Sequence, residues 1–294
     1  MKTSIIGAGQ MGSGIAQVFA TKGHHVTLVD LNQAALDRGI GAISHSLDRL
    51  LKKERITAAD KTAILDRISV ATDLATGVAE AELVVEAATE NVELKLKIFS
   101  DLDQYAPLGC MLATNTSSIS ITKIAAATKR PEAVIGMHFM NPVPIMKLVE
   151  VIRGYATSDD TTSKIMSLST QLGKVPVEVN DYPGFVANRI LMPMINEAIT
   201  TLWEGVAGVQ EIDTVMKLGM AHPMGPLQLA DFIGLDTCLA ILRVMHEGFG
   251  RAHYAPCPLL VNMVQAGKLG KKSGEGFYDY ASGGKDLVVS KVFG

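Results

Sequence analysis

The segment Gly7-Ala-Gly-Gln-Met-Gly12 decides the fold. It matches the pattern G-x-G-x-x-G and lies between an apolar run at residues 3–6 and a helical pattern of apolar residues. In this pattern the first glycine permits a tight turn, the second lets a pyrophosphate approach the backbone, and the third lets helix and strand pack closely. The exposed N–H groups at the start of the helix can bind the phosphates. The residues expected to hold a dinucleotide here are Gly7, Gly9, Gln10, Met11 and Gly12.

Asp30 supports this interpretation. It ends the next apolar run, residues 25–29, and lies 18 residues after Gly12. A carboxylate in this place accepts hydrogen bonds from the adenine ribose hydroxyls and repels a 2′-phosphate, which favours NAD over NADP. The alternative is a glycine-rich turn with Asp30 as a helix cap. The agreement of strand, loop, helix and acidic residue favours the cofactor site.

Strand and helix patterns alternate as far as residue 180, which predicts a mostly parallel, doubly wound sheet of the Rossmann type. The expected strands are residues 3–6, 25–29, 83–86, 110–113, 134–138 and 147–152, with 68–71 as a further short one. The interval 31–82 is too long for one connection. It holds two helical patterns, 34–53 and 57–67, and predicts a helical hairpin that projects from the sheet.

The sequence changes character after Asp181-Tyr-Pro-Gly184, which is a turn signal. From there to residue 265 the pattern is helical. The expected helices are 186–204, 210–217, 227–247 and 258–265. We therefore expect a dinucleotide-binding domain at 1–182 and a smaller, all-α domain at 183–294.

Composition excludes several classes of protein. Of the 294 residues, 48% are hydrophobic and 19% are charged, which excludes intrinsic disorder. The net charge of −3 argues against a nucleic-acid partner. Three cysteines without a CxxC pair argue against a disulfide framework. The early first strand leaves no room for a signal peptide, and no long apolar run predicts a membrane span. We expect a soluble, cytoplasmic protein without a membrane partner.

His138 and Glu150 form the candidate catalytic pair. The link at residues 139–146 is too short for a parallel crossover, so the two strands that it joins should be antiparallel. With the turn centred near Pro144, His138 and Glu150 lie opposite each other. A buried carboxylate orients an imidazole and raises its basicity, which suits a general acid/base. The alternative is a hydrogen-bonded core histidine; the dinucleotide loop upstream favours catalysis.

Other polar residues stand at strand ends or in a basic cluster. Asn115 and Ser117 follow the run at 110–113. Ser117 could also cap a helix, and no G-x-S-x-G pattern makes it a hydrolase nucleophile. The remaining histidines have no metal-ligand spacing, so no metal site is expected. Four cations gather at the end of the first helix of the hairpin, where the alternative is a solvated helix end: Arg49, Lys52, Lys53 and Arg55.

The sequence resembles the L-3-hydroxyacyl-CoA dehydrogenase family, above all its short bacterial members that act on 3-hydroxybutyryl-CoA. The resemblance covers nearly the whole chain. The segments that carry it are GAGQMGSGIA (7–16), EAATEN (86–91), TNTSSISI (114–121), GMHFMNPVP (136–144), LVEVI (148–152), PGFVANR (183–189), HPMGP (222–226) and GEGFY (274–278).

This resemblance implies a reaction and roles for the residues. The reaction is the NAD-dependent, reversible oxidation of an (S)-3-hydroxyacyl-CoA to a 3-ketoacyl-CoA in fatty-acid or butyrate-type metabolism. His138 would be the base and Glu150 its electrostatic partner, while Asn188 and Ser117 would position the reacting oxygens. The implied ligand contacts are Glu90, Lys95, Asn115, Ser117 and Asn141 for the cofactor, and Ser46, Lys53 and Ser117 for the acyl-CoA.

Two alternatives to this function remain. One is an NAD-dependent dehydrogenase of a free 3-hydroxy acid, and the other is a non-catalytic dinucleotide-binding protein on the same fold. The resemblance also implies that the helical domain forms a homodimer. Its apolar stripes, for example Ile190, Leu191, Met194, Ile195 and Ile199, exceed what a small domain can bury internally.

Overall fold

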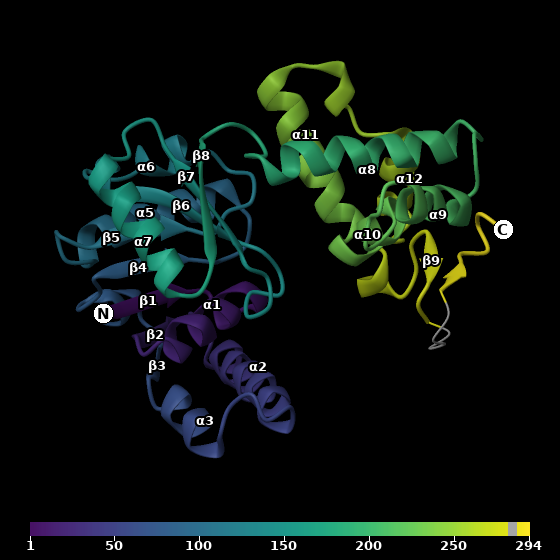
Figure 1. Ribbon diagram of the computed structural model, residues 1–294. Coiled ribbons are helices and arrows are strands. Elements are labelled where there is room, and N and C mark those ends of the chain that lie inside the picture. The colour runs from purple at the N-terminus through teal and green to yellow at the C-terminus, as the bar shows by residue number, and fades with distance from the viewer. Residues whose placement is uncertain (282–286) are drawn as a thin grey trace. The chain divides into compact units, whose positions relative to one another are not determined.

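The computed structural model describes residues 1–281 and 287–294 and divides the chain into two compact units (Figure 1). The first unit is Met1–Tyr182 and the second is Pro183–Gly294. Each unit has its own hydrophobic core.

The first unit is built on one eight-stranded sheet in the order β3-β2-β1-β4-β5-β6-β7-β8. Neighbouring strands are parallel except for β6 and β7, which are antiparallel. The predicted mostly parallel sheet is confirmed. Its strands are β1 (Lys2–Ile6), β2 (His25–Val29), β3 (Ile68–Ala71), β4 (Leu83–Glu86), β5 (Met111–Thr114), β6 (Val134–Phe139), β7 (Leu148–Arg153) and β8 (Val175–Asn180).

Helices cover both faces of this sheet, as the doubly wound fold requires. Successive side chains of β1 point to opposite faces. Ser4 donates a hydrogen bond from its hydroxyl to the carbonyl oxygen of Gly77 in α4 (Leu74–Val78), 2.6 Å away. Ile5 faces Gly12 in α1 (Gln10–Thr21), where a Cβ atom would lie 3.5 Å from the Ile5 Cγ2. Strand order reverses at β1, between β2 and β4, and this switch point is where such sheets bind ligands.

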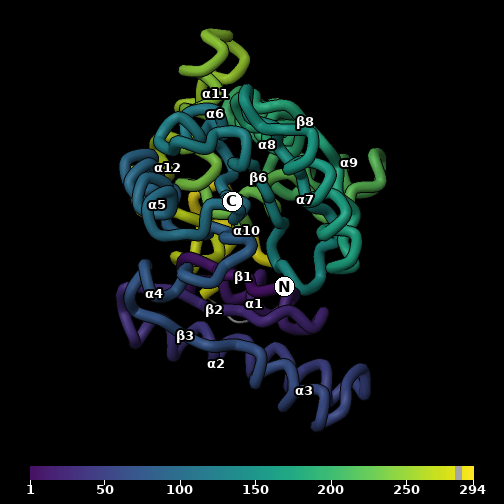
Figure 2. The backbone as a smooth tube through the Cα atoms, turned by 90° about the vertical axis from the view of Figure 1, so that its left-hand side faces the viewer, coloured from purple at the N-terminus to yellow at the C-terminus, as the bar shows by residue number. Residues whose placement is uncertain are grey.

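The predicted helical hairpin is confirmed. It consists of α2 (Gln33–Lys52) and α3 (Ala58–Leu65), which run side by side beyond the β3 edge of the sheet (Figures 1 and 2). α2 buries Leu36, Ile43 and Leu47 along one stripe and leaves its other face to solvent. The remaining helices of this unit are α5 (Val92–Tyr105), α6 (Ile121–Ala125) and α7 (Asp159–Gln171).

α7 and β8 were not predicted from the sequence. β8 reads VPVEVN and is mostly exposed, because it forms the edge of the sheet. Proline is tolerated in such an edge strand because one side of the strand makes no ladder bonds. The strand therefore lacks the apolar character that identified the buried strands.

The second unit is mainly helical, but the expectation of an all-α domain was too simple. Two short antiparallel strands, β9 (Tyr278–Asp279) and β10 (Val288–Val289), pair near its end. The single helix expected at 227–247 is two helices, because Gly234 at φ 104° interrupts it. The helices are α8 (Ala187–Trp203), α9 (Val209–Gly219), α10 (Pro226–Ile233), α11 (Leu235–Phe249) and α12 (Pro258–Gln265).

Two buried carboxylates join the helices of the second unit to its final segment. Asp213 accepts hydrogen bonds from the backbone N–H groups at the start of α10 and, at 2.8 Å, from the Tyr278 hydroxyl. Asp231 accepts from the backbone N–H groups of Phe277 and Tyr278 at 3.0 and 2.9 Å. Burial raises the pKa of Asp231 to about 6. Within the described residues, no helix combines the length and the apolar character that a membrane crossing needs.

Candidate active site

The glycine loop leaves one side of its backbone open and packs tightly on the others. Gly7 has φ 100°, and a Cβ atom on it would lie 2.7 Å from the Ala87 carbonyl oxygen. A Cβ atom on Gly12 would lie 1.8 Å from the Gly7 carbonyl oxygen, whereas one on Gly9 would meet nothing within 4 Å. The loop therefore fits a pyrophosphate, which would approach the backbone at Gly9 beside the start of α1.

Asp30 holds this loop in place. Its Oδ2 accepts a hydrogen bond from the backbone N–H of Ala8 at 2.9 Å, and its Oδ1 accepts from the N–H of Asn32 at 3.2 Å. Asn32 is the N-cap residue of α2, so Asp30 does not cap that helix. The carboxylate thus lies at the end of β2, next to the glycine loop, where a ribose would meet it.

A cleft of about 380 Å³ lies beside the glycine loop. The turn between β6 and β7 forms one of its walls, and α2 forms another. Lys174 supports this turn by donating from its ammonium to the carbonyl oxygens of Val143 and Met146. Of the three residues expected to meet the acyl-CoA, Ser46 lines the cleft, but Ser117 and Lys53 do not. Lys53 follows α2 as its exposed C-cap residue. The polar residues that line the cleft include Gln10, Ser13, Arg38, Ser46, Arg49 and Asn141.

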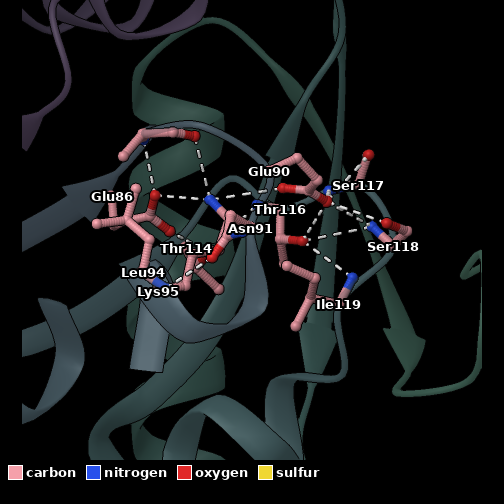
Figure 3. Close-up of polar contacts among 11 residues, drawn as sticks. Glu86, Glu90, Asn91, Leu94, Lys95, Thr114, Thr116, Ser117, Ser118 and Ile119 are labelled. Atoms are coloured by element: carbon pink, nitrogen blue, oxygen red, sulfur yellow. Dashed lines mark hydrogen bonds and ion pairs between the residues drawn. The ribbon is translucent and has the colours of Figure 1, made fainter. Parts of the chain in front are cut away.

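On the other side of the switch point, Glu86 ends β4 and is fully buried. It accepts hydrogen bonds from the Lys95 ammonium at 2.6 Å, the Thr114 hydroxyl at 2.7 Å and the backbone N–H of Ala88 at 2.7 Å (Figure 3). Lys95 is 1% exposed and lies on the first turns of α5. The two charged groups therefore connect the ends of β4 and β5 with α5.

Glu90 organises the loop that follows β5. Its Oε1 accepts from the Thr116 hydroxyl at 2.6 Å and from the backbone N–H groups of Ser117 and Ser118 at 2.9 and 3.1 Å (Figure 3). Its Oε2 lies 3.5 Å from the Lys95 ammonium. Burial raises the pKa of Glu90, but Lys95 and these hydrogen bonds outweigh burial, so that the pKa lies below its usual value.

His138 and Glu150 face each other across β6 and β7, as the length of the connecting link predicts. The two residues are register partners in the antiparallel pair, and the His138 Nδ1 lies 2.8 Å from the Glu150 Oε2. Both side chains are buried. Asn115 ties the end of β5 to this pair by accepting a hydrogen bond from the backbone N–H of Phe139 at 2.9 Å.

Ser117 and Asn188, the two residues expected to position the reacting oxygens, belong to different units. Ser117 does not cap a helix, because the N-cap residue of α6 is Ser120. Asn188 is buried on the first turn of α8 and belongs to the second unit. The sequence analysis gave no role to Glu86, although a glutamate at the end of the apolar run Leu-Val-Val could have identified it, as Glu150 was identified within its strand.

Comparison with known proteins decides the family. The model of the 3-hydroxyacyl-CoA dehydrogenase NAD binding domain matches residues 2–182, and that of the 3-hydroxyacyl-CoA dehydrogenase C-terminal domain matches residues 184–280. The chain belongs to the 3-hydroxyacyl-CoA dehydrogenase family. Its glycine loop, Asp30 and the Glu86–Glu90 segment all lie within the NAD-binding domain of this family.

Relatives of similar length support the assignment to the 3-hydroxyacyl-CoA dehydrogenases. The chain is 58% identical to the probable 3-hydroxybutyryl-CoA dehydrogenase of Deinococcus radiodurans over 95% of this chain and 100% of that protein. It is 55% identical to that of Bacillus subtilis over 94% and 96%. The crystal structure of (S)-3-hydroxybutyryl-CoA dehydrogenase from Ralstonia eutropha is similar with a TM-score of 0.92 and 52% identity, covering 95% of this chain and 98% of that one.

The contacts of Asp30 generate a prediction on cofactor choice. Asp30→Ala should weaken NADH binding about 10- to 150-fold, since hydrogen bonds to a charged group contribute about 1.5–3 kcal/mol and about 1.4 kcal/mol corresponds to tenfold. It should also narrow the preference for NADH over NADPH, because the repulsion of the 2′-phosphate is lost. Calorimetric titration with both cofactors measures the two affinities. Loss of the loop contact to Ala8 would weaken both cofactors alike, so the ratio of affinities is the decisive quantity.

The matched control for Asp30 is Asp37→Ala. This exposed carboxylate in α2 accepts a hydrogen bond from the Gln33 side chain at 2.9 Å and is not part of the cleft lining. Its replacement should leave both affinities unchanged. Equal binding of NADH and NADPH by the unaltered protein would show that Asp30 does not discriminate between them.

Proposed function

We propose that this protein catalyses the NAD-dependent, reversible oxidation of (S)-3-hydroxybutyryl-CoA to acetoacetyl-CoA. The observation that carries the proposal is the buried His138–Glu150 pair. His138 lies near the carboxyl end of β6, and the dinucleotide loop follows the carboxyl end of β1, on the same side of the sheet. The names of the similar bacterial proteins support the short acyl chain. NAD, when bound, supplies the acceptor for the hydride that leaves C3 of the substrate.

In this reaction His138 is the general base. With its Nδ1–H donated to Glu150, the neutral ring carries a lone pair at Nε2, and this atom takes the proton from the substrate hydroxyl. The carboxylate of Glu150 then stabilises the imidazolium that forms. In the direction of reduction, the same Nε2 returns the proton to the alkoxide oxygen.

The other candidate residues hold the two ligands in the proposed mechanism. Asn188 and Ser117 position the reacting oxygens of the substrate. The nicotinamide half of the cofactor meets Glu90, Lys95, Asn115 and Asn141, while Gly9 to Gly12 and Asp30 hold the pyrophosphate and adenosine half. Ser46 on α2 and Lys53 directly after it bind the coenzyme A portion. These positions keep the substrate carbon and the cofactor in reacting geometry, which is the main contribution of such sites besides proton transfer.

Replacement of His138 tests the acid/base role. His138→Ala should lower kcat about 10²–10⁴-fold, the usual contribution of a positioned acid/base group, and leave the Kd for NADH nearly unchanged. Steady-state oxidation of NADH with acetoacetyl-CoA gives kcat, and fluorescence titration gives Kd. The control is His25→Ala at the exposed start of β2, which should keep full activity. Unimpaired turnover in folded His138→Ala would remove this residue from the mechanism.

The coenzyme A contacts distinguish the proposed substrate from a free 3-hydroxy acid. Lys53→Ala should raise KM for acetoacetyl-CoA severalfold and leave kcat nearly intact, because a contact remote from the reacting carbon is equal in ground and transition states. The effect should shrink at high salt, since exposed charges are screened. Lys164→Ala on α7, another exposed lysine, is the control.

Assays of the unaltered protein with an acyl-CoA and with the free acid distinguish the two substrate classes. The protein should oxidise NADH with acetoacetyl-CoA and show at least about 100-fold lower kcat/KM with acetoacetate, given the binding energy that coenzyme A contributes. The reverse preference would favour the dehydrogenase of a free acid. Binding of NADH without turnover of either compound would favour a non-catalytic dinucleotide-binding protein.

We further propose that the second unit forms a homodimer of a cytoplasmic enzyme. Ile195 and Ile199 of the predicted stripes are fully buried within the unit, but Ile190, Val206 and Leu218 are 69%, 71% and 81% exposed. Large apolar side chains left in water favour association with a second copy. Light scattering should give twice the chain mass of 31.3 kDa at micromolar concentration. A mass of one chain under these conditions would contradict the dimer.

A further inference from the structure

The topology of the sheet places Glu86, Lys95 and Glu90 on the nicotinamide side of the proposed site. β1 lies between β2, which ends next to Asp30, and β4, which ends at Glu86. The glycine loop touches both neighbours, through the hydrogen bond from Ala8 to Asp30 and through the close approach of Gly7 to Ala87. A dinucleotide with its adenine ribose at Asp30 and its pyrophosphate on this loop would extend its other half toward β4 and β5.

These three residues carry an unbalanced charge. Lys95 supplies one ammonium, which lies 2.6 Å from a Glu86 oxygen and 3.5 Å from a Glu90 oxygen. Two carboxylates and one ammonium give a formal charge of −1. The further hydrogen-bond donors to the carboxylates are backbone N–H groups and the hydroxyls of threonine and serine, which are neutral. We name Glu86, Lys95 and Glu90 the acidic triad.

Burial strengthens the field of the acidic triad. Glu86 is 0% and Lys95 1% exposed, so water does not surround this ion pair. The Glu90 side chain is 38% exposed, so it is the member of the acidic triad that water reaches. Charges in such surroundings are screened less than charges on the surface, and their effect reaches a neighbouring ligand.

We propose that the acidic triad makes this site bind the oxidised cofactor more tightly, relative to the reduced cofactor, than an uncharged site would. The nicotinamide ring of NAD⁺ is a cation, and the dihydronicotinamide ring of NADH is neutral. A net negative charge beside the ring stabilises the first form and has little effect on the second. The inference rests on the proposed function, because it requires that the nicotinamide half lies beside β4 and β5.

The acidic triad then biases the reaction on the protein toward reduction of the ketone. NADH, when bound, would supply a hydride to C3 of acetoacetyl-CoA and would become cationic at its ring, while the His138 imidazolium would give its proton to the oxygen on C3. The negative charge of the triad stabilises the ring cation that this transfer creates. Glu86 contributes as a positioning residue, since it acts through its charge and through Lys95 rather than by touching the substrate.

The test is Glu86→Gln, which keeps the size of the side chain and removes one negative charge. Isothermal titration calorimetry with NAD⁺ and with NADH gives both dissociation constants. The ratio Kd(NAD⁺)/Kd(NADH) should rise about two- to tenfold, the range that Coulomb's law gives for one nearby charge under partial screening. A purely structural role for Glu86 would weaken both forms alike and leave this ratio unchanged.

Two control variants separate charge from packing. Thr114→Val removes the hydrogen bond from the Thr114 hydroxyl to Glu86 and keeps all charges, so the ratio should stay constant. Asp103→Asn removes a charge paired with Arg130 on the same helix, eight residues beyond Lys95, or about 12 Å at 1.5 Å per residue. It too should leave the ratio unchanged.

A second variant keeps the proposal testable if Glu86→Gln does not fold. Glu90→Gln removes the same charge at a partly exposed position and should raise the ratio in the same direction. An unchanged ratio in a folded variant of either kind would overturn the proposal. Failure of the unaltered protein to bind NAD⁺ or NADH would instead contradict the proposed function.

Discussion

The hydrogen bond between the His138 Nδ1 and the Glu150 Oε2 depends on a single constraint, the short link between β6 and β7. Because so few residues cannot cross over a sheet, β7 must turn back beside β6, and the two side chains become register partners. The same turn lines the cleft beside the glycine loop, and Lys174 fixes it through two backbone carbonyls. One short connection thus sets both the orientation of the imidazole and a wall of the cleft.

Carboxylates that accept hydrogen bonds from backbone N–H groups hold the loops at the carboxyl ends of the parallel strands. Asp30 accepts from Ala8 in the glycine loop, Glu86 accepts from Ala88, and Glu90 accepts from Ser117. Such charge-assisted bonds are stronger than neutral ones and fix loops that would otherwise be mobile. In the proposed function each of these carboxylates lies beside the cofactor, so that the groups that build the site supply its electrostatic field as well.

Much of the fold and the core of the site can be predicted from the sequence, because these features rest on local signals. The glycine spacing, the buried apolar strands and the short link identify the doubly wound sheet and the His138–Glu150 pair. β8 could not be recognised in this way, since an edge strand with Pro176 and exposed side chains lacks the pattern of a buried strand. The break at Gly234 was missed because one glycine does not by itself show that the backbone adopts a positive φ.

The partners of the buried charges were harder to predict than the charges themselves. Glu86 and Lys95 are nine residues apart, and Thr114 comes from another strand, so their contacts depend on how β4, β5 and α5 pack. Lys174 supports a turn about thirty residues earlier in the chain. Periodicity identifies elements, but it does not show which loop a distant side chain will reach.

The kinetics of Glu150→Gln test the central claim most directly. Glutamine keeps the size of the side chain and an acceptor for the His138 Nδ1–H, but it removes the negative charge that stabilises the imidazolium. With acetoacetyl-CoA and NADH, the account predicts a loss in kcat of about 100-fold or more and a Kd for NADH within about twofold of the unaltered value. A folded Glu150→Gln protein with nearly unaltered kcat would contradict the claim that this pair carries the proton transfer.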